Sequence, residues 1–145
     1  MTTQPPSLSS LAAIAALVLT LGACETLPPP GCDNSDGALD DAAFVFVTSP
    51  VAGQRVGPGF PVSGCSRTFE ANVQWRLLAR DGSVLASGFT SGGGVDGHAP
   101  FSFTVPFTLD ERQIGHLEVF DEDVSDGEGF PPGRTVVPLV LMPGG

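Results

Sequence analysis

The part of the chain that follows residue 42 is a series of short β-like runs separated by turn residues. In residues 73–77 apolar and polar residues alternate, as expected for a strand with one buried face. In residues 101–107 four large apolar residues occupy every second position. No segment after residue 22 has sustained helical periodicity. Because side chains alternate between the two faces of a strand, this pattern restricts the region to β-structure.

Turn residues at regular spacing divide this region into about seven strands. The expected strands are residues 44–47, 60–65, 73–77, 84–89, 101–107, 116–120 and 134–141. Asp81 and Gly82 indicate a hairpin turn between two of them. Pro106 cannot donate to a sheet ladder, so its strand is expected to end there or to lie at an edge. The sequence predicts an all-β fold, an immunoglobulin-like antiparallel β-sandwich of about seven strands.

The aromatic residues are expected to form the core of this sandwich. The chain contains ten Phe and one Trp. Trp75 lies in the third expected strand, where sandwiches of the immunoglobulin type often bury a tryptophan. We therefore expect Trp75 and the phenylalanines to pack in the interior, in preference to forming a platform for a ligand.

The N-terminal segment has the features of a bacterial lipoprotein signal. Residues 11–21 are apolar but too few to span a bilayer as a helix, which takes about 20 residues, and they match the h-region of a signal peptide. The tetrapeptide LGAC follows and ends at Cys24, so it resembles a lipobox. We predict a lipoprotein signal peptide over residues 1–23 and acylation of Cys24. Residues 1–10 lack Lys and Arg, and the alternative is an ordinary signal peptide beside a chance cysteine.

Residues 24–42 are expected to be a Pro/Gly-rich tether, and residues 43–145 the immunoglobulin-like domain. If Cys24 carries lipid, Cys32 and Cys65 remain as a pair for a disulfide in an oxidising compartment. This bridge would attach the tether to the second expected strand; two free thiols are the alternative. The expected location is the cell envelope outside the cytoplasm, with the acylated N-terminus in the lipid bilayer. Glu25 favours the outer membrane in a Gram-negative cell.

The charge of the chain excludes one class of partner. It contains sixteen acidic and six basic residues, and its net charge is −10. A chain this acidic is repelled by a phosphate backbone. We therefore expect no nucleic-acid partner.

Several short motifs are distributed along the expected domain. They are TSP at 48–50, PVSG at 61–64, FEANVQWRL at 69–77, DG at 81–82, PF at 100–101 and DG at 126–127. With these motifs, residues 44–141 resemble the immunoglobulin-like domain of bacterial spore-germination and related envelope proteins, often found beside a GerM-type domain. The resemblance implies a sandwich in an extracytoplasmic protein, without a catalytic motif. Cys65 departs from the small residue expected there.

The acidic loop near the C-terminus is the densest group of oxygen ligands in the chain. Its candidate binding residues are Asp121, Asp123 and Asp126. The EF-hand spacing fails because Gly127 falls at the seventh position, so a solvated loop is favoured over a calcium site. His98 and His116 have no spacing that requires zinc. We expect no metal and no cofactor.

The sequence also lacks the signals of an enzyme, since it has no G-x-S-x-G motif. Sandwich domains bind partners through end loops and sheet edges, and the candidate loops are residues 91–99 and 121–133. We expect a non-catalytic binding module whose partner is an envelope protein or a cell-wall polysaccharide. The alternatives are a structural spacer or assembly lipoprotein without a specific ligand, and an inhibitor of an envelope hydrolase.

Overall fold

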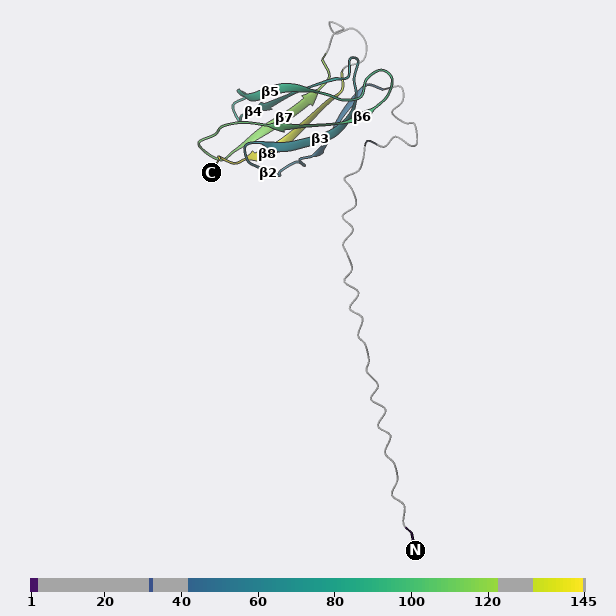
Figure 1. Ribbon diagram of the computed structural model, residues 1–145. Coiled ribbons are helices and arrows are strands. Elements are labelled where there is room, and N and C mark those ends of the chain that lie inside the picture. Colours follow the sequence, from purple (N-terminus) through teal and green to yellow (C-terminus); the bar gives the residue numbers. More distant parts are fainter. Residues whose placement is uncertain (3–31, 33–41, 123–131, 145) are drawn as a thin grey trace.

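The computed structural model describes residues 1–2, 32, 42–122 and 132–144 (Figure 1). Within these ranges the chain forms strands and no helix. The strands are β1 (Phe44–Ser49), β2 (Arg55–Val56), β3 (Phe60–Arg67), β4 (Asn72–Leu78), β5 (Val84–Ser91), β6 (Ala99–Val105), β7 (Gln113–Phe120) and β8 (Arg134–Leu141). In this part of the chain no helix long and apolar enough to cross a membrane is found.

The strands form two sheets, one with the order β1-β3-β6 and one with the order β2-β8-β7-β4-β5. All the pairs are antiparallel except β2 with β8, which is parallel. The predicted all-β sandwich is confirmed, and each of the seven expected strands is present. The two-residue strand β2 is not among the expected strands. Two residues are too few to show the alternation of apolar and polar side chains that identifies a strand.

The core lies between the two sheets and is built from alternate residues of the long strands. Val73, Leu77, Leu117 and Val119 are fully buried, and burying one such side chain contributes about 1.5–3 kcal/mol. Trp75 is 7% exposed and stacks on Phe103 of the opposite sheet, with ring centroids 4.9 Å apart. The core position predicted for Trp75 is therefore confirmed.

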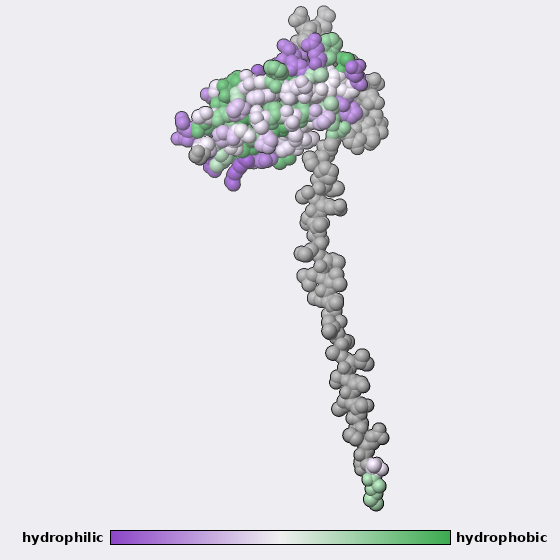
Figure 2. All heavy atoms as spheres, viewed as in Figure 1, coloured by the Kyte–Doolittle hydropathy of each residue, from purple (hydrophilic) through white to green (hydrophobic). Residues whose placement is uncertain are grey.

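The expectation that the phenylalanines belong to the core is wrong for three of them. Phe46, Phe69 and Phe89 are exposed. Phe46 and Phe89 occupy outward positions of their strands, and Phe69 follows the end of β3. Figure 2 shows apolar residues at the surface of the domain among polar ones. Residue type alone therefore does not predict whether such a ring is buried, because the outward face of a strand does not contact the core.

The sandwich has two ends, a disulfide end and a far end. At the disulfide end, β3, β5 and β7 finish and β1, β4, β6 and β8 begin. At the far end, β2 pairs with the last residues of β8, close to the C-terminus. Figure 1 shows the strands running lengthwise between these ends.

Candidate functional site

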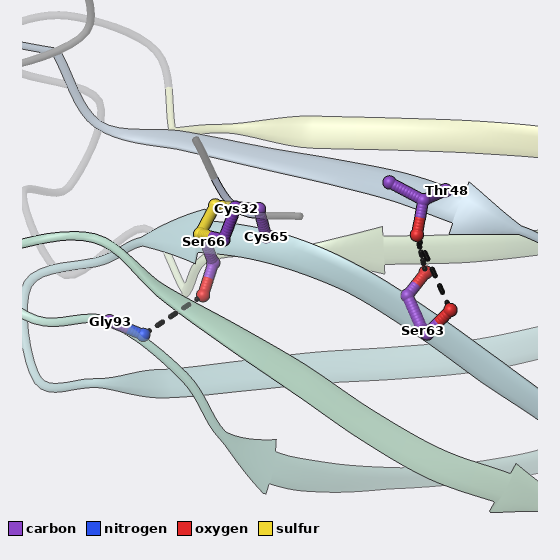
Figure 3. Close-up of a disulfide and its surroundings, with 6 residues drawn as sticks. All are labelled: Cys32, Thr48, Ser63, Cys65, Ser66 and Gly93. Atoms are coloured by element: carbon purple, nitrogen blue, oxygen red, sulfur yellow. Dashed lines mark hydrogen bonds between the residues drawn. A yellow bond between two sulfur atoms is a disulfide. The ribbon is translucent and has the colours of Figure 1, made fainter. Parts of the chain in front are cut away.

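A disulfide joins the N-terminal segment to the three-stranded sheet. Cys32 is bonded to Cys65 of β3, with 5.0 Å between their Cα atoms and a separation of 33 positions in the sequence (Figure 3). This confirms the predicted pairing and its attachment to the second expected strand. Cys65 is buried close to the disulfide end. A bridge of this kind is typical of proteins in oxidising compartments.

The glycine-rich loop of residues 91–99 is held on β3 by buried hydrogen bonds. The Gly93 N–H donates to Ser66 Oγ over 3.2 Å, as Figure 3 shows. The Thr68 hydroxyl and N–H both donate to the Gly93 carbonyl, over 3.1 and 2.9 Å. A Cβ atom on Gly93 would lie 2.3 Å from the Ser66 carbonyl oxygen, so only glycine permits this approach.

The tip of the same loop projects from the sandwich. The N–H of Gly97 donates to the carbonyl of Gly94 over 3.1 Å and closes a tight turn. Val95 lies in this turn, and its side chain is exposed. Arg67 Nη2 at the end of β3 donates to the Val95 carbonyl over 3.3 Å. The loop therefore presents an apolar side chain from a position fixed to β3.

A pocket of about 200 Å³ lies at the disulfide end, and we call it the end pocket. Its lining residues are Ala42, Ala43, Arg67, Thr68, Phe69, Val95 and Asp121. Val95 comes from the first candidate loop and Asp121 from the second, so one described residue of each loop lines this pocket. The walls are mainly apolar, with one guanidinium and one carboxyl group. Apolar pockets with a few polar groups are the usual form of a binding site.

Asp121 is the described member of the three predicted acidic binding residues. It follows β7 and is buried, and its N–H donates to the Gly133 carbonyl over 2.9 Å. Burial raises the pKa of the Asp121 carboxyl above its ordinary value, while backbone hydrogen bonds from Phe69 and Glu122 act in the opposite direction. Asp123 and Asp126 lie outside the described residues.

A second hollow, of about 490 Å³, lies at the far end. It is lined by Arg80, Leu109, Asp110, Glu111, Arg112 and Gln113. Its four charged side chains are exposed and already hydrated. A ligand would have to displace this water, whereas the apolar walls of the end pocket gain from being covered. The end pocket is therefore the better candidate, although it is the smaller of the two.

The two histidines lie apart. His98 precedes β6 at the disulfide end, whereas His116 is exposed on β7 and pairs with Leu78 near the far end. Among residues 42–122 and 132–144, together with Cys32, no group of three His, Cys, Asp or Glu side chains is placed to hold a metal ion. The described part of the end pocket offers binding contacts and no nucleophile–base pair.

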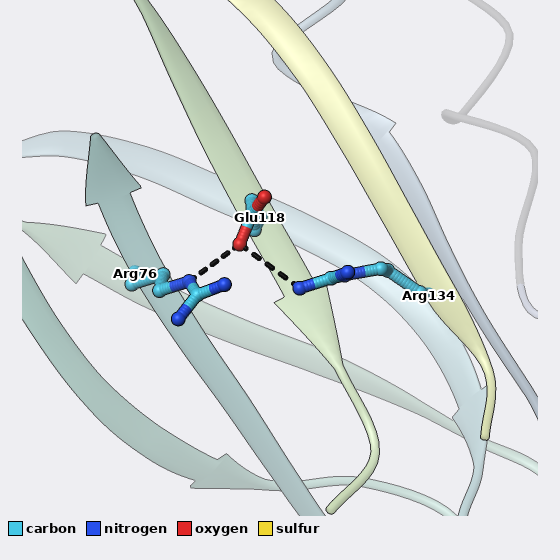
Figure 4. Close-up of polar contacts among 3 residues, drawn as sticks. All are labelled: Arg76, Glu118 and Arg134. Atoms are coloured by element: carbon cyan, nitrogen blue, oxygen red, sulfur yellow. Dashed lines mark hydrogen bonds and ion pairs between the residues drawn. The ribbon is translucent and has the colours of Figure 1, made fainter. Parts of the chain in front are cut away.

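The outer face of the five-stranded sheet carries a charged cluster that the sequence did not predict. Glu118 of β7 accepts hydrogen bonds from Arg76 of β4 and Arg134 of β8, the second over 3.1 Å (Figure 4). The two guanidinium carbons lie 5.5 and 5.6 Å from the centroid of the Phe120 ring. These residues lie on three different strands, so only the strand register brings them together. The one sign of the cluster in the sequence is that Glu118 and Phe120 are two residues apart and therefore lie on the same face of their strand.

Two packed sheets with Trp75 between them define an immunoglobulin-like β-sandwich. A family model described as the immunoglobulin-like domain of bacterial spore germination matches residues 44–128, more than half of the chain. The chain belongs to this family, which confirms the resemblance found in its sequence.

Two further comparisons add little to the family match. A search of curated proteins finds no match. The crystal structure of CopC from Methylosinus trichosporium OB3b is similar at 15% sequence identity and a TM-score of 0.42, covering 72% of this chain and 97% of CopC. This likeness gives no information on function.

Proposed function

We propose that the protein is a lipid-anchored lipoprotein of the bacterial cell envelope whose immunoglobulin-like domain is a non-catalytic binding module. Its partner is an envelope protein or a cell-wall polysaccharide. The observation that carries this proposal is the end pocket, to which both candidate loops contribute. The Cys32–Cys65 disulfide supports a location outside the cytoplasm. Acylation of Cys24, which lies outside the described residues, supplies the proposed anchor.

The end pocket is suited to binding because its walls are held in place before a partner arrives. Arg67 is the last residue of β3, which is joined covalently to Cys32, and Phe69 lies two residues beyond it. Val95 belongs to the loop that the buried hydrogen bonds of Ser66 and Thr68 hold against the end of this strand. A rigid site loses less conformational entropy on binding than a mobile one, and the exposed Phe69 and Val95 provide apolar area to bury.

The disulfide also limits the distance between the pocket and the proposed anchor. Eight residue steps separate Cys24 from Cys32, and a fully extended chain spans at most about 3.3–3.6 Å per residue. The attachment point on β3 therefore lies within about 28 Å of the acylated residue. A partner at the membrane surface is within reach of a site held at this distance.

Site-specific photo-crosslinking in intact cells tests the binding proposal. A photoreactive amino acid replaces Phe69 or Val95 beside the end pocket, with Val51 at the far end as the matched control. These three side chains are 61%, 59% and 62% exposed. We expect a discrete adduct from positions 69 and 95 and none from position 51. The absence of adducts at 69 and 95, or equal adducts at all three, would contradict the proposal and favour the spacer role.

The anchor is tested separately by the intact mass of the membrane-extracted protein, with Cys24→Ala as the control. We expect a chain that begins at Cys24 and carries acyl groups, and loss of both features in the variant. An unmodified chain cleaved elsewhere would refute the lipoprotein part of the proposal and leave the crosslinking result intact.

A further inference from the structure

The disulfide fixes the side of the sandwich from which the N-terminal segment departs. On β3, Cys65 has the same parity as Pro61 and Ser63, which point away from the core. Figure 3 shows the Cys32–Cys65 bridge on the opposite side of β3 from the inward Ser66 hydroxyl. Cys32 therefore lies on the outer face of the three-stranded sheet, which we call the anchor face.

The anchor face is almost free of charge and carries an exposed aromatic ring. Arg67 is the one ionisable residue at its outward positions, and it is cationic. Phe46 is 48% exposed and is the register partner of Cys65, so this ring stands beside the residue that is bonded to Cys32. The outward positions are Phe44, Phe46, Thr48, Pro61, Ser63, Cys65, Arg67, Pro100, Ser102 and Thr104.

The length of the tether limits which surfaces of the domain can face a bilayer that holds Cys24. Eight residue steps join Cys24 to Cys32, a span of at most about 28 Å. The far end begins five residues along β3 from Cys65, about 17 Å away. The outer face of the five-stranded sheet lies on the side turned away from Cys32, beyond a sheet spacing of about 10 Å. Bringing either of these surfaces to the bilayer restricts the tether to extended paths, which costs conformational entropy.

Charge distinguishes the two surfaces that lie close to Cys32. The disulfide end is also near, since β3 finishes two residues after Cys65. Its loops expose the carboxylates of Glu70, Asp96 and Glu122, which an anionic headgroup layer repels. The outward positions of the anchor face include no carboxylate. The anchor face is therefore the surface that both the tether and the charge permit.

We infer that the anchor face is the membrane-facing surface of the domain and lies against the phospholipid headgroup layer. This inference rests on the proposed acylation of Cys24. Phe46 supplies apolar area at the headgroup boundary, and the Arg67 guanidinium matches the negative potential of anionic lipid. The strands then run parallel to the membrane. The end pocket opens sideways along the surface, where a partner in the envelope can reach it.

Photo-crosslinking to lipid tests this orientation. The acylated protein is reconstituted in vesicles of phosphatidylethanolamine and phosphatidylglycerol, with a photoreactive phenylalanine analogue at position 46, 95 or 136. Val136 is the matched control, because it is 47% exposed on the outer face of the five-stranded sheet. Val95, 59% exposed, reports on the disulfide end. Mass spectrometry measures the lipid adducts, and we expect severalfold more at position 46 than at either other position.

The orientation and the anchor are refuted by different results. An acylated chain with equal lipid adducts at positions 46 and 136, with most adducts at position 95, or with none at any position would overturn the orientation and leave the anchor intact. A chain whose intact mass shows no acyl group and which does not float with the vesicles would refute the anchor, and this inference with it.

A pair of charge variants tests the same face without moving the probe. With the photoreactive residue at position 46, Ser102→Glu/Thr104→Glu adds two carboxylates to exposed positions of the anchor face. We expect this variant to lose most of the lipid adduct in the anionic vesicles and less of it in phosphatidylcholine vesicles. Ile114→Glu/Val136→Glu makes the same change on the opposite face, at residues that are 51% and 47% exposed, and is expected to keep the adduct. Thermal unfolding establishes that both variants are folded, and equal losses of adduct in the two would count against the inference.

Discussion

The two ends of the sandwich are closed by different means. At the disulfide end a covalent bond, two buried hydroxyl groups and a buried carboxyl group meet around β3. At the far end the β4–β5 hairpin closes with a short exposed turn, in which Asp81 Oδ1 accepts hydrogen bonds from Ser83 N–H and Oγ–H over 3.0 and 2.6 Å. The disulfide end thus contains buried polar groups, whereas the β4–β5 hairpin at the far end closes with a short exposed turn.

This difference shows which features the fold requires. A short turn of Asp81, Gly82 and Ser83 is sufficient to join two strands, so a sandwich does not need buried polar groups at its ends. Burying Ser66, Thr68 and Asp121 removes them from water and is tolerated only because each finds a partner. The disulfide and the buried polar groups shape the end pocket. This supports the proposal that the disulfide end is the end that binds a partner.

The largest expected effect comes from removing the covalent bond. The variant Cys32→Ala/Cys65→Ala should lower the free energy of unfolding by about 3–4 kcal/mol, because the bridge closes a loop of 33 residues in the unfolded chain. Urea denaturation measures this loss, with Cys24→Ala as a control that leaves the bridge intact. A loss below about 1 kcal/mol would mean that the disulfide end is held by packing alone.

An intermediate effect is expected from one buried hydroxyl. Ser66→Ala leaves the buried N–H of Gly93 without its acceptor and should cost about 1–3 kcal/mol. Ser83→Ala, in the exposed turn at the far end, should change stability by no more than about 0.5 kcal/mol. Chemical denaturation compares the two variants, and hydrogen exchange at Gly93 locates the change. Equal losses of stability in the two variants would show that the buried hydroxyl at the disulfide end contributes no more than the exposed hydroxyl at the far end.

The smallest effect is a pair of pH dependences of opposite sign. The pKa of Asp121 is raised by burial, so its contribution to stability is present below the unfolded pKa of about 3.9 and is lost as the pH rises through the folded pKa. The pKa of Asp81 is lowered by the hydrogen bonds from Ser83, so its contribution is present above about 3.9 and is lost as the pH falls through the folded pKa.

Asp121→Asn and Asp81→Asn each remove one of these contributions. Relative to the unaltered chain, we expect Asp121→Asn to gain stability as the pH rises and Asp81→Asn to lose it. Thermal melts across the acidic range up to neutral pH record both differences. Slopes of the same sign for the two variants would show that the carboxyl groups do not differ in environment as described.

The sequence predicted the features that depend on local pattern. Alternation in residues 73–77 and 101–107 identified strands of both sheets, and the position of Trp75 in its strand identified a core residue. The Asp81–Gly82 pair identified the β4–β5 hairpin, and cysteine counting identified the disulfide. Each of these signals lies within a few residues or depends on elimination among three cysteines.

The features that were missed depend on which segments lie side by side. Arg67 and Val95 are 28 residues apart and meet only because the glycine-rich loop packs on β3. Phe89 is apolar like a core residue but is exposed, because it lies on the face of β5 that points away from the core. The cluster around Glu118 needs the register of three strands, which no local pattern contains.

The disulfide has a mechanical consequence. A pull on the chain ahead of Cys32 enters the domain at Cys65, in the central strand of the three-stranded sheet, and bypasses the edge strand β1. Force applied at Phe44 would load only the ladder between β1 and β3. Force applied at β3 loads the ladders with both β1 and β6, so the covalent link distributes the load over two strand pairs instead of one.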